Sequence, residues 1–526
     1  MCARRIAAAS AVRRRPAAWP GSAILTWLLA AGMLAAAGCA SLPPRAPATS
    51  AVEHRRPDGS TPLEWAVYRG NVAAARRLLR AGANPNDTND YGATPLSLAA
   101  VTGNAPIIKL LLKYGADANS PNADGETALM LVARTGNLEA AKLLLRHGAN
   151  VNARGRFRGQ TALMWASARR KPRMMELLID HGADIGARSA VYDYERHVTA
   201  EGRAKTEDTG GLTPLMFAAR ENCLACVNVL IAHHVNIDQA DPDGYAPVTI
   251  AILNADWDIA KRLIEAGCDV NQWDIYGQGP LYAAVDMGNV VSDGRNPTDP
   301  TSHATEHDIV RLLLDHGANP NMQLFFRPKN RLFAGAGTLV SRGTTPLIRA
   351  AASGDATVVK MLLAHGADVH LYQADHETPM IAALSGGGPF GGGSSESQAI
   401  AVLEVLHAAG ADVNVLAIPH PLKRTRGGTA LHFATRHHWK RAMALLIAYG
   451  ADVNAKDADG LTALDYAMGR GYVPFLGKKH GPQWDLVKLL HGWGATVQLA
   501  KAPYWPPQGP PLGYAVYKPV IWPLGP

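Results

Sequence analysis

The sequence predicts an all-α protein in which short helices, joined in pairs, form one long stack. The stretch at residues 90–122 starts again at Thr127, 33 residues after Thr94, and the same pattern recurs along most of the chain. Each unit also carries apolar residues three or four positions apart, the spacing of one face of a helix. Because one unit of this length cannot bury its apolar face alone, the units must stack on one another.

The first half of the unit has the signals of a short helix. Thr94 can cap the helix N-terminus with its hydroxyl group, and Pro95 follows at the first helical position, where no N–H is needed. Gly103 can end the helix because glycine adopts the left-handed conformation without strain. The apolar face of this helix consists of Leu96, Leu98 and Ala99.

The second half of the unit predicts a second helix followed by a tight turn. Ile107, Leu110 and Leu111 supply its buried stripe, and Gly115 ends it. The Asn-Ala-Asp-Gly run at residues 122–125 has the composition of a turn. The unit is therefore a helix, a second helix and a turn that leads into the next unit.

This unit resembles the ankyrin repeat, with its T-P-L-H-x-A helix start and its second helix ending in L-L-x-x-G-A-D-x-N. The resemblance implies an ankyrin-repeat solenoid of about eleven helix-turn-helix repeats over residues 58–497, without a break into globular domains. Most starts are 33 or 34 residues apart, and they lie at Thr61, Thr94, Thr127, Thr161, Thr213, Ala246, Gly279, Thr345, Thr378, Thr429 and Thr462.

Insertions interrupt this register, and insertions in solenoids map to surface loops that often border the binding face. The second and third of them flank the seventh unit, where we expect the largest non-repeat structure. The insertions are residues 188–209, 290–305, 323–342, 386–393, 415–427 and 471–482.

The N-terminal residues 1–39 differ from the repeats. Five arginines precede an apolar run at residues 23–37, which predicts an export signal, since a membrane-spanning helix needs roughly 20 apolar residues. The following Gly38-Cys39 resembles a bacterial lipoprotein box, although Ala36 stands where leucine is commonest. The resemblance implies lipidation of Cys39, with a plainly cleaved signal or an uncleaved anchor as alternatives. Ala40 after the cysteine implies an outer-membrane lipoprotein facing the periplasm, with a secreted or periplasmic protein as the alternative.

The charge balance of the chain argues against nucleic acid as a partner. The chain has 52 Lys and Arg and 44 Asp and Glu, but residues 1–38 contain five of the arginines and no acid. Without them the balance is 47 to 44, which is not the basic footprint of a nucleic-acid-binding protein.

Residues 40–57 are predicted to form a flexible tether. Residues 498–526 are predicted to form a Pro-rich and aromatic tail that either docks on the array or stays partly ordered.

Two motifs suggest chemistry. His303-Ala304-Thr305-Glu306-His307 has the H-x-x-E-H spacing of a small class of zinc peptidases, but a solenoid offers neither the long buried helix nor the third ligand that such a site needs, so we interpret the spacing as coincidence. Cys223 and Cys226 form C-x-x-C at the start of a second helix. Because Cys226 aligns with buried Ile107, packing is favoured, with a local disulfide or a redox role as alternatives.

Several positions in the first helices read as structural. The slot four residues after each start holds Trp65, Trp165, Phe217, Phe433 and Tyr466 in five units, and leucine fills it in others, which predicts core packing. His432 occupies the T-P-L-H position, where the family uses histidine for structural hydrogen bonds. Cys268 replaces the alanine of Gly-Ala-Asp and also reads as packing.

We therefore predict a non-catalytic protein-interaction scaffold, a monomer without cofactor or metal, that is tethered by lipid in the bacterial envelope. The family implies a concave groove of turn tips and first helices that binds a protein. Aromatic and arginine side chains are typical of interface hot spots. They occur here at the predicted partner-binding residues Phe157, Arg158, Arg169, Arg220, Tyr245, Ile275 and Tyr276. A metal-dependent hydrolase built on an insertion and a structural spacer are the alternatives.

Overall fold

A computed structural model of the protein describes residues 54–191, 210–288, 302–326, 342–385, 394–418, 427–470 and 482–496. Within these ranges the chain forms 22 helices, and its only β-structure is two isolated bridges. The described helices all belong to one compact unit of residues 52–526. The predicted all-α class is confirmed.

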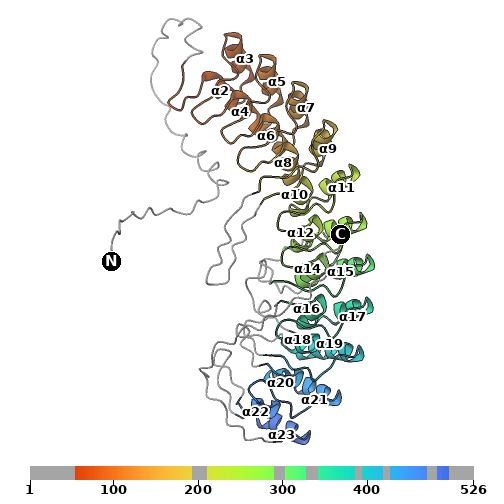
Figure 1. The fold of residues 1–526 in the computed structure, drawn as a ribbon. Coiled ribbons are helices and arrows are strands. Elements are labelled where there is room, and N and C mark those ends of the chain that lie inside the picture. The colour runs from red at the N-terminus through yellow and green to blue at the C-terminus, as the bar shows by residue number, and fades with distance from the viewer. Residues whose placement is uncertain are drawn as a thin grey trace, which may run out of the picture. The chain divides into compact units, whose positions relative to one another are not determined.

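The helices form eleven pairs (Figure 1). The first helices are α2 (Pro62–Tyr68), α4 (Pro95–Thr102), α6 (Ala128–Thr135), α8 (Ala162–Ala168), α10 (Pro214–Arg220), α12 (Pro247–Leu253), α14 (Pro280–Gly288), α16 (Pro346–Ser353), α18 (Pro379–Ser385), α20 (Ala430–Arg436) and α22 (Ala463–Ala467). The second helices are α3 (Val72–Arg80), α5 (Ala105–Lys113), α7 (Leu138–Arg146), α9 (Pro172–Asp180), α11 (Leu224–Ala232), α13 (Trp257–Glu265), α15 (Glu306–Asp315), α17 (Ala356–Ala364), α19 (Glu396–Ala408), α21 (Lys440–Ala448) and α23 (Trp484–Gly492).

Every first helix begins at the residue after a predicted start, and in most repeats the side chain of the start residue caps the helix N-terminus. The Thr94 hydroxyl accepts a hydrogen bond from the Ser97 N–H at 3.0 Å, and the Ser97 hydroxyl oxygen accepts one from the Thr94 N–H at 2.9 Å. This reciprocal pair satisfies two N–H groups that a helix end leaves without partners. At the other end, Gly103 has φ 64°, as its left-handed cap position requires.

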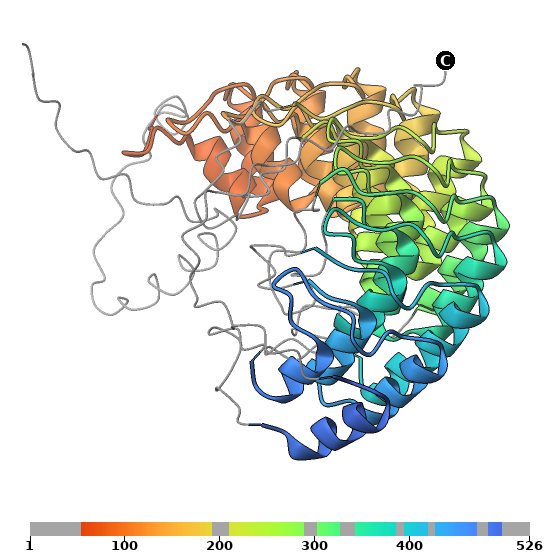
Figure 2. The same ribbon diagram turned by 60° about the horizontal axis from the view of Figure 1, so that its bottom comes forward.

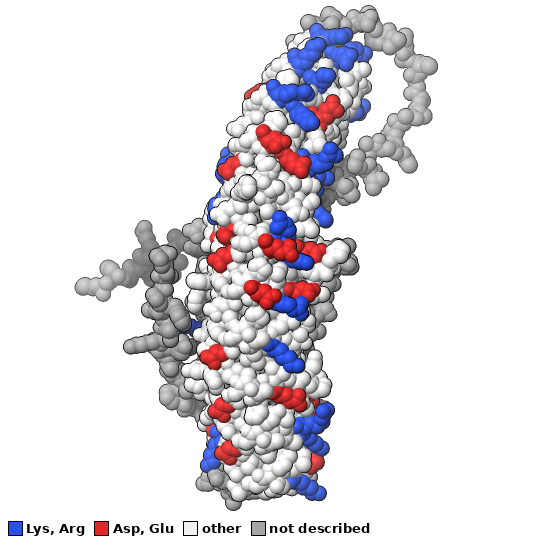
Figure 3. All heavy atoms as spheres, turned by 90° about the vertical axis from the view of Figure 1, so that its right-hand side faces the viewer, with Lys and Arg blue, Asp and Glu red and all other residues white. Residues whose placement is uncertain are grey.

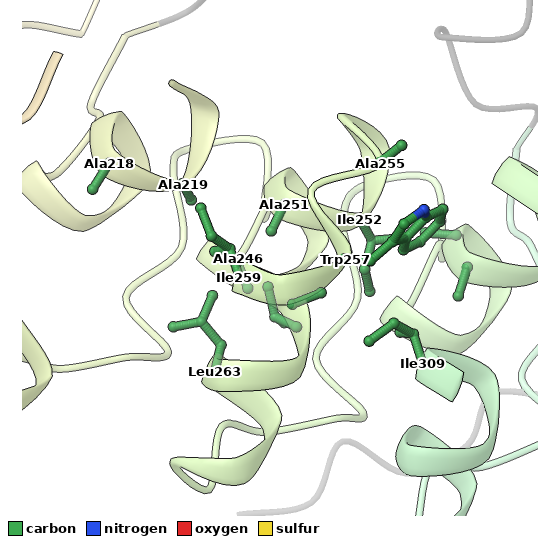
Figure 4. Close-up of a cluster of buried hydrophobic side chains, with 14 of the residues drawn as sticks. Ala218, Ala219, Ala246, Ala251, Ile252, Ala255, Trp257, Ile259, Leu263 and Ile309 are labelled. Carbon is green, nitrogen blue, oxygen red and sulfur yellow. The ribbon is translucent and has the colours of Figure 1, made fainter. Parts of the chain in front are cut away.

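The pairs stack so that each first helix contacts the next first helix, and the second helices from α3 to α21 likewise contact one another in order. Figure 2 shows the two layers that result. One hydrophobic cluster runs through the stack from Leu63 to Ala495. In repeat six, Ile252, Ile259 and Leu263 pack between side chains of the neighbouring repeats (Figure 4). Each repeat thus buries its apolar face only by having neighbours.

A ladder of asparagine hydrogen bonds joins the repeats at the ends of the second helices. Asn119 donates its amide to the Gly148 carbonyl at 2.8 Å, and its amide oxygen accepts from the Asn150 N–H at 2.7 Å. One side chain therefore satisfies backbone groups of the next repeat in both directions. The equivalent side chains that donate to the next glycine carbonyl are Asn86, Asn152, Asn271, Asn321, Asn414 and Asn454.

Two insertions leave and re-enter the stack at adjacent points. Val191 and Gly210 form an antiparallel bridge near the two ends of the first insertion, and Ala417 and Gly428 form one near the two ends of the fifth. Most other residues of the predicted insertions, the export signal with Cys39, the tether up to residue 53 and the tail from residue 497 lie outside the described residues. In the part of the chain that is described, no helix has the length and apolar character needed to cross a bilayer.

Candidate functional site

The turn before α8 presents two of the predicted partner-binding residues to solvent. Phe157 is 60% exposed, and Arg158 is also exposed. The turn is closed by the Gly155 N–H, which donates to the Gln160 carbonyl at 3.0 Å. The Arg158 carbonyl accepts from the Ala190 N–H at 2.8 Å, which ties this turn to the next one. The backbone therefore holds both side chains outward on a fixed support.

Two further predicted residues, Arg169 and Arg220, lie at the C-terminal ends of α8 and α10 and are exposed. The Arg220 guanidinium lies 5.0 Å from the ring centre of Phe217, and its Nη2 lies 3.2 Å from Glu221 Oε1. Because α8 and α10 pack against each other, these ends belong to adjacent repeats. The exposed side chains of Phe157, Arg158, Arg169 and Arg220 are called the tip surface below.

The aromatic slot of the first helices is only partly core. Phe217 and Phe433 are buried, as predicted, but Trp65, Trp165 and Tyr466 are half-buried. Arginines cover the two tryptophans: Arg56 lies 3.8 Å and Arg134 lies 4.8 Å from the respective ring centres. Cation–π contacts of this kind stabilise an exposed pair by roughly 0.5–1 kcal/mol. The slot therefore also contributes aromatic and guanidinium groups to the surface near the tips.

The remaining predicted residues do not share this exposure, so the expectation of equivalent exposed tips is wrong at Tyr276. Tyr276 is 8% exposed, and Tyr245 and Ile275 are half-buried. The following turn folds over this one, because the Phe325 and Phe326 N–H groups both donate to the Tyr276 carbonyl, at 2.8 and 3.2 Å. Replacing Tyr245 and Tyr276 by alanine would therefore disturb packing as well as any interface. Their partner-binding role stays a prediction.

A buried carboxylate underlies this turn. Asp274 is 2% exposed, and its Oδ1 accepts from the N–H groups of Tyr276 at 2.8 Å and Gln278 at 2.9 Å. Burial raises the pKa of Asp274 to about 6, and burial beside Asp274 raises the pKa of the Tyr245 hydroxyl as well. Asp274 shapes the turn from inside and is not available to a partner.

A buried ion pair joins repeats seven and eight. Arg349 of α16 occupies the aromatic slot and is 4% exposed, and its Nε donates to Oδ1 of Asp286 on α14, which is fully buried. Both neighbours of Arg349 in this slot are alanines, Ala283 and Ala382, which leave room for the long side chain. The sequence contained this signal, an arginine in an otherwise apolar slot, but it was not recognised.

The H-x-x-E-H spacing does not bring its two histidines to one point. His303 precedes α15, and its Nδ1 lies 3.2 Å from Asp258 Oδ2, whereas His307 Nε2 lies 2.8 Å from Asp355 Oδ2. The geometry is thus not that of a zinc peptidase helix. Glu306, His307 and Asp355 could hold a metal ion, because their ligand atoms lie within 4.8 Å of one another. Burial raises the pKa of Glu306 to about 7.

The cysteines require one correction. Cys223 and Cys226 form a disulfide at the N-terminus of α11, so the favoured packing interpretation of separate thiols is wrong, although both residues are buried. Three-residue spacing at a helix start brings the two Cα atoms to 5.2 Å, within reach of a disulfide. Cys268 is buried as expected, and burial raises the pKa of its thiol to about 12.

His432 makes the structural hydrogen bonds expected of its position. Its Nδ1 lies 3.1 Å from the Thr429 nitrogen, and its Nε2 lies 3.1 Å from the Leu461 carbonyl of the next repeat. Burial lowers the pKa of this imidazole, so the neutral form is favoured. Asp465, in the same slot of the last repeat, is paired with Arg470 at 2.9 Å.

Sequence reasoning missed part of the exposed aromatic surface. Trp273 is 50% exposed and Tyr372 is 43% exposed, and both lie within the turns that lead into first helices, as does Tyr91 at 72%. Phe325 and Phe326, 47% and 62% exposed, lie in the predicted third insertion. For Tyr91, Trp273 and Tyr372, the available signal was an aromatic residue within the six positions before a helix start.

Comparison with known proteins identifies what this geometry is similar to. The family model described as "Ankyrin repeats (3 copies)" matches residues 17–122, 114–189, 196–274, 215–324, 281–373, 303–416 and 392–486. A putative ankyrin repeat-containing protein of Treponema pallidum (strain Nichols) is 34% identical over 121 residues, which cover 23% of this chain and 35% of that protein. The human Ankyrin repeat and SOCS box protein 11 is 29% identical over 109 residues, 20% of this chain and 28% of that protein.

The chain thus spans about a third of the length of these curated relatives. Among solved structures, the crystal structure of the human ASB11 ankyrin repeat domain matches 52% of this chain and 99% of its own, with a TM-score of 0.37 and 22% sequence identity.

Proposed function

Because the chain belongs to the ankyrin-repeat family, we propose that it is a non-catalytic scaffold that binds a protein partner through its turn tips and first helices. The observation that carries this proposal is the tip surface. Phe157, Arg158, Arg169 and Arg220 are bulky side chains of the types enriched at interface hot spots, and all four are exposed on rigid turns or helix ends. Burying such groups against a partner costs little additional ordering of the backbone.

We further propose that the scaffold is anchored in a bacterial envelope by lipid on Cys39. The basic residues, the apolar run at 23–37 and the Gly38-Cys39 pair support this proposal. The disulfide between Cys223 and Cys226 also supports it, because disulfides persist in oxidising compartments such as the periplasm. Ala40 as the residue after the cysteine supports an outer-membrane placement facing the periplasm.

The partner proposal is tested with the double variant Phe157→Ala/Arg158→Ala. We expect it to retain the wild-type unfolding curve and to lose the partner recovered by wild-type protein from envelope extract, by about 2 kcal/mol or more once that partner is purified and titrated. A matched control, Arg173→Ala/Glu176→Ala, changes exposed residues of α9 in the same repeat. Equal recovery by both variants would place the partner site elsewhere on the array.

The anchor is tested by mass spectrometry of the N-terminal peptide of protein isolated from membranes. The expected peptide begins at Cys39 and carries the mass of acyl chains. An unmodified Cys39, or a chain that begins at Met1, contradicts the anchor without bearing on the tip surface.

A further inference from the structure

Basic side chains form two rows on the second helices of the first three repeats. Arg76, Lys109 and Lys142 make one row and Arg80, Lys113 and Arg146 the other, with steps of 33 residues along each. Within each helix the two members are four residues apart, so they lie on one face. Because α3 packs on α5 and α5 on α7, the six side chains form an array on one surface, called the basic grid below.

The basic grid is exposed and uncompensated. All six side chains are exposed, and Arg77 adds a seventh beside them. Among the described residues, none of the seven takes part in an ion pair within 4.0 Å. Figure 3 shows the Lys and Arg side chains gathered over one end of this face. The patch is therefore free to bind an anionic surface.

The grid ends abruptly at the fourth repeat. The next positions of the two rows are Glu176 and Asp180, and in repeats six and seven the two positions carry opposite charges, as in Lys261 and Glu265 at 3.9 Å. Helices α3, α5 and α7 carry seven Lys and Arg against one acid, whereas the other eight second helices carry eight against ten. The concentration is thus specific to one end of the stack.

Helix stability does not account for the grid. Cations near a helix C-terminus are favourable, which would explain Arg80, Lys113 and Arg146. The same physical effect acts on every second helix, yet Asp180 and Glu265 stand at the equivalent position in repeats four and six. The first row lies a full turn earlier, where this effect is weaker.

We propose that the basic grid docks on a membrane surface of anionic phospholipid headgroups. This inference rests on the proposed anchor at Cys39, which precedes α2 by 23 residues and so can lie no more than about 80 Å of extended chain from it. The repeats nearest the anchor along the chain are the ones that carry the grid. Each Lys or Arg held within a Debye length of an anionic bilayer strengthens its binding, and a flat array brings several into that range together.

Docking through the second helices leaves the other layer of the stack available. The tip surface belongs to turns and first helices, which form the opposite layer (Figure 1). A membrane-docked array can therefore bind its protein partner at the same time. The grid orients the scaffold, while the lipid supplies the attachment.

The test uses residues 40–526, which keep the whole core from Leu63 to Ala495 and lack the lipid. Binding is measured by flotation with vesicles of equal phosphatidylglycerol and phosphatidylcholine, and with phosphatidylcholine alone. The variant Arg76→Gln/Lys109→Gln/Lys142→Gln removes one row. The matched control Lys261→Gln/Arg311→Gln/Lys360→Gln removes three cations from the same row position in repeats six to eight.

We expect binding only to vesicles with phosphatidylglycerol, weakening with salt, about tenfold or more weaker in the row variant and unchanged in the control. Equal weakening in both variants would show a net-charge effect and overturn the grid as a site. Absence of vesicle binding, or preference for duplex DNA over vesicles at the same salt, would overturn the membrane as its partner. If the protein binds these vesicles but Cys39 is unmodified in protein isolated from membranes, the basic grid is supported and the lipid anchor is contradicted. The failures of the two proposals are therefore distinguishable.

Discussion

Repeats two to four and repeats six to eight are built from the same pair of helices, but the two groups differ in which side chains they expose and which they bury. In the first group, Tyr91 and Phe157 stand exposed on their turns, at 72% and 60%. In the second, Tyr276 is 8% exposed, and Asp274, Asp286 and Arg349 are buried. The frame is set by caps and apolar spacing that both groups share. The difference shows that residues at equivalent repeat positions need not share a function when neighbouring turns fold over them.

The largest effect is expected from the ion pair that only the second group contains. Arg349→Met leaves Asp286 charged and buried, which should reduce the free energy of unfolding by about 3–5 kcal/mol. Urea unfolding followed by circular dichroism measures it. Arg311→Met breaks an exposed pair with Asp308 and should cost less than about 1 kcal/mol. A similar loss in both variants would mean that burial does not distinguish the two pairs.

The second largest loss of stability is expected from a substitution in the hydrophobic core of repeats two to four. Leu111→Ala removes a fully buried side chain of α5 and should cost about 2–5 kcal/mol. Since solenoid stability sums over neighbouring repeats, amide exchange should accelerate mainly in repeats one to three. Val101→Ala, at a position 60% exposed, is the control for loss of methyl groups without a cavity. Uniform acceleration along the whole stack would contradict this local coupling.

The third effect is a pH dependence of the free energy of unfolding, which is expected from Asp274 in repeats six to eight. Asp274 has a pKa raised to about 6 by burial, so the folded state binds a proton that the unfolded state, with a pKa near 3.8, has already lost. Its contribution to stability is fully present below about pH 4 and is lost as the pH rises through about 6. Asp274→Asn keeps the acceptor oxygen, so it should flatten this fall and stabilise the protein at pH 7 by about 1–3 kcal/mol.

The pH dependence of unfolding, measured for both proteins between pH 4 and 7, decides this prediction. Asp308 should have the opposite pH dependence, because hydrogen bonds from Thr305 lower its pKa. Its contribution to the stability of the wild-type protein is therefore lost as the pH falls, and Asp308→Asn should remove that loss. An unchanged pH profile in Asp274→Asn would show that Asp274 is ionised in the folded protein.

The smallest effect is expected from the ladder of asparagine hydrogen bonds, which both groups of repeats contain. Asn119→Ala removes hydrogen bonds to Gly148 and Asn150 of the next repeat and should cost about 1 kcal/mol. Asn150→Ala removes only a side-chain bond to Asn152 in its own loop, at 3.0 Å, and should leave the coupling between repeats intact. Thermal unfolding of both variants tests the comparison. A larger loss in Asn150→Ala would place the coupling in the loop itself.

The stack and its register were determined by the sequence alone. Thr94, Pro95 and Gly103 act within a few residues of one another, so the start and end of the helix follow from local chemistry. The 33-residue period then requires stacking, because no unit buries its own apolar face. All eleven predicted starts immediately precede a helix for this reason.

Only the tertiary structure decided what each turn exposes and which groups pair. The Tyr276 carbonyl accepts a hydrogen bond from the N–H of Phe325, which lies 49 positions later in the chain, and Arg349 binds Asp286 from 63 positions away. Burial and electrostatic pairing at such separations depend on which turns and helices meet across repeats. The periodic pattern gives only the position in the turn, and that position is the same at exposed Tyr91 as it is at buried Tyr276.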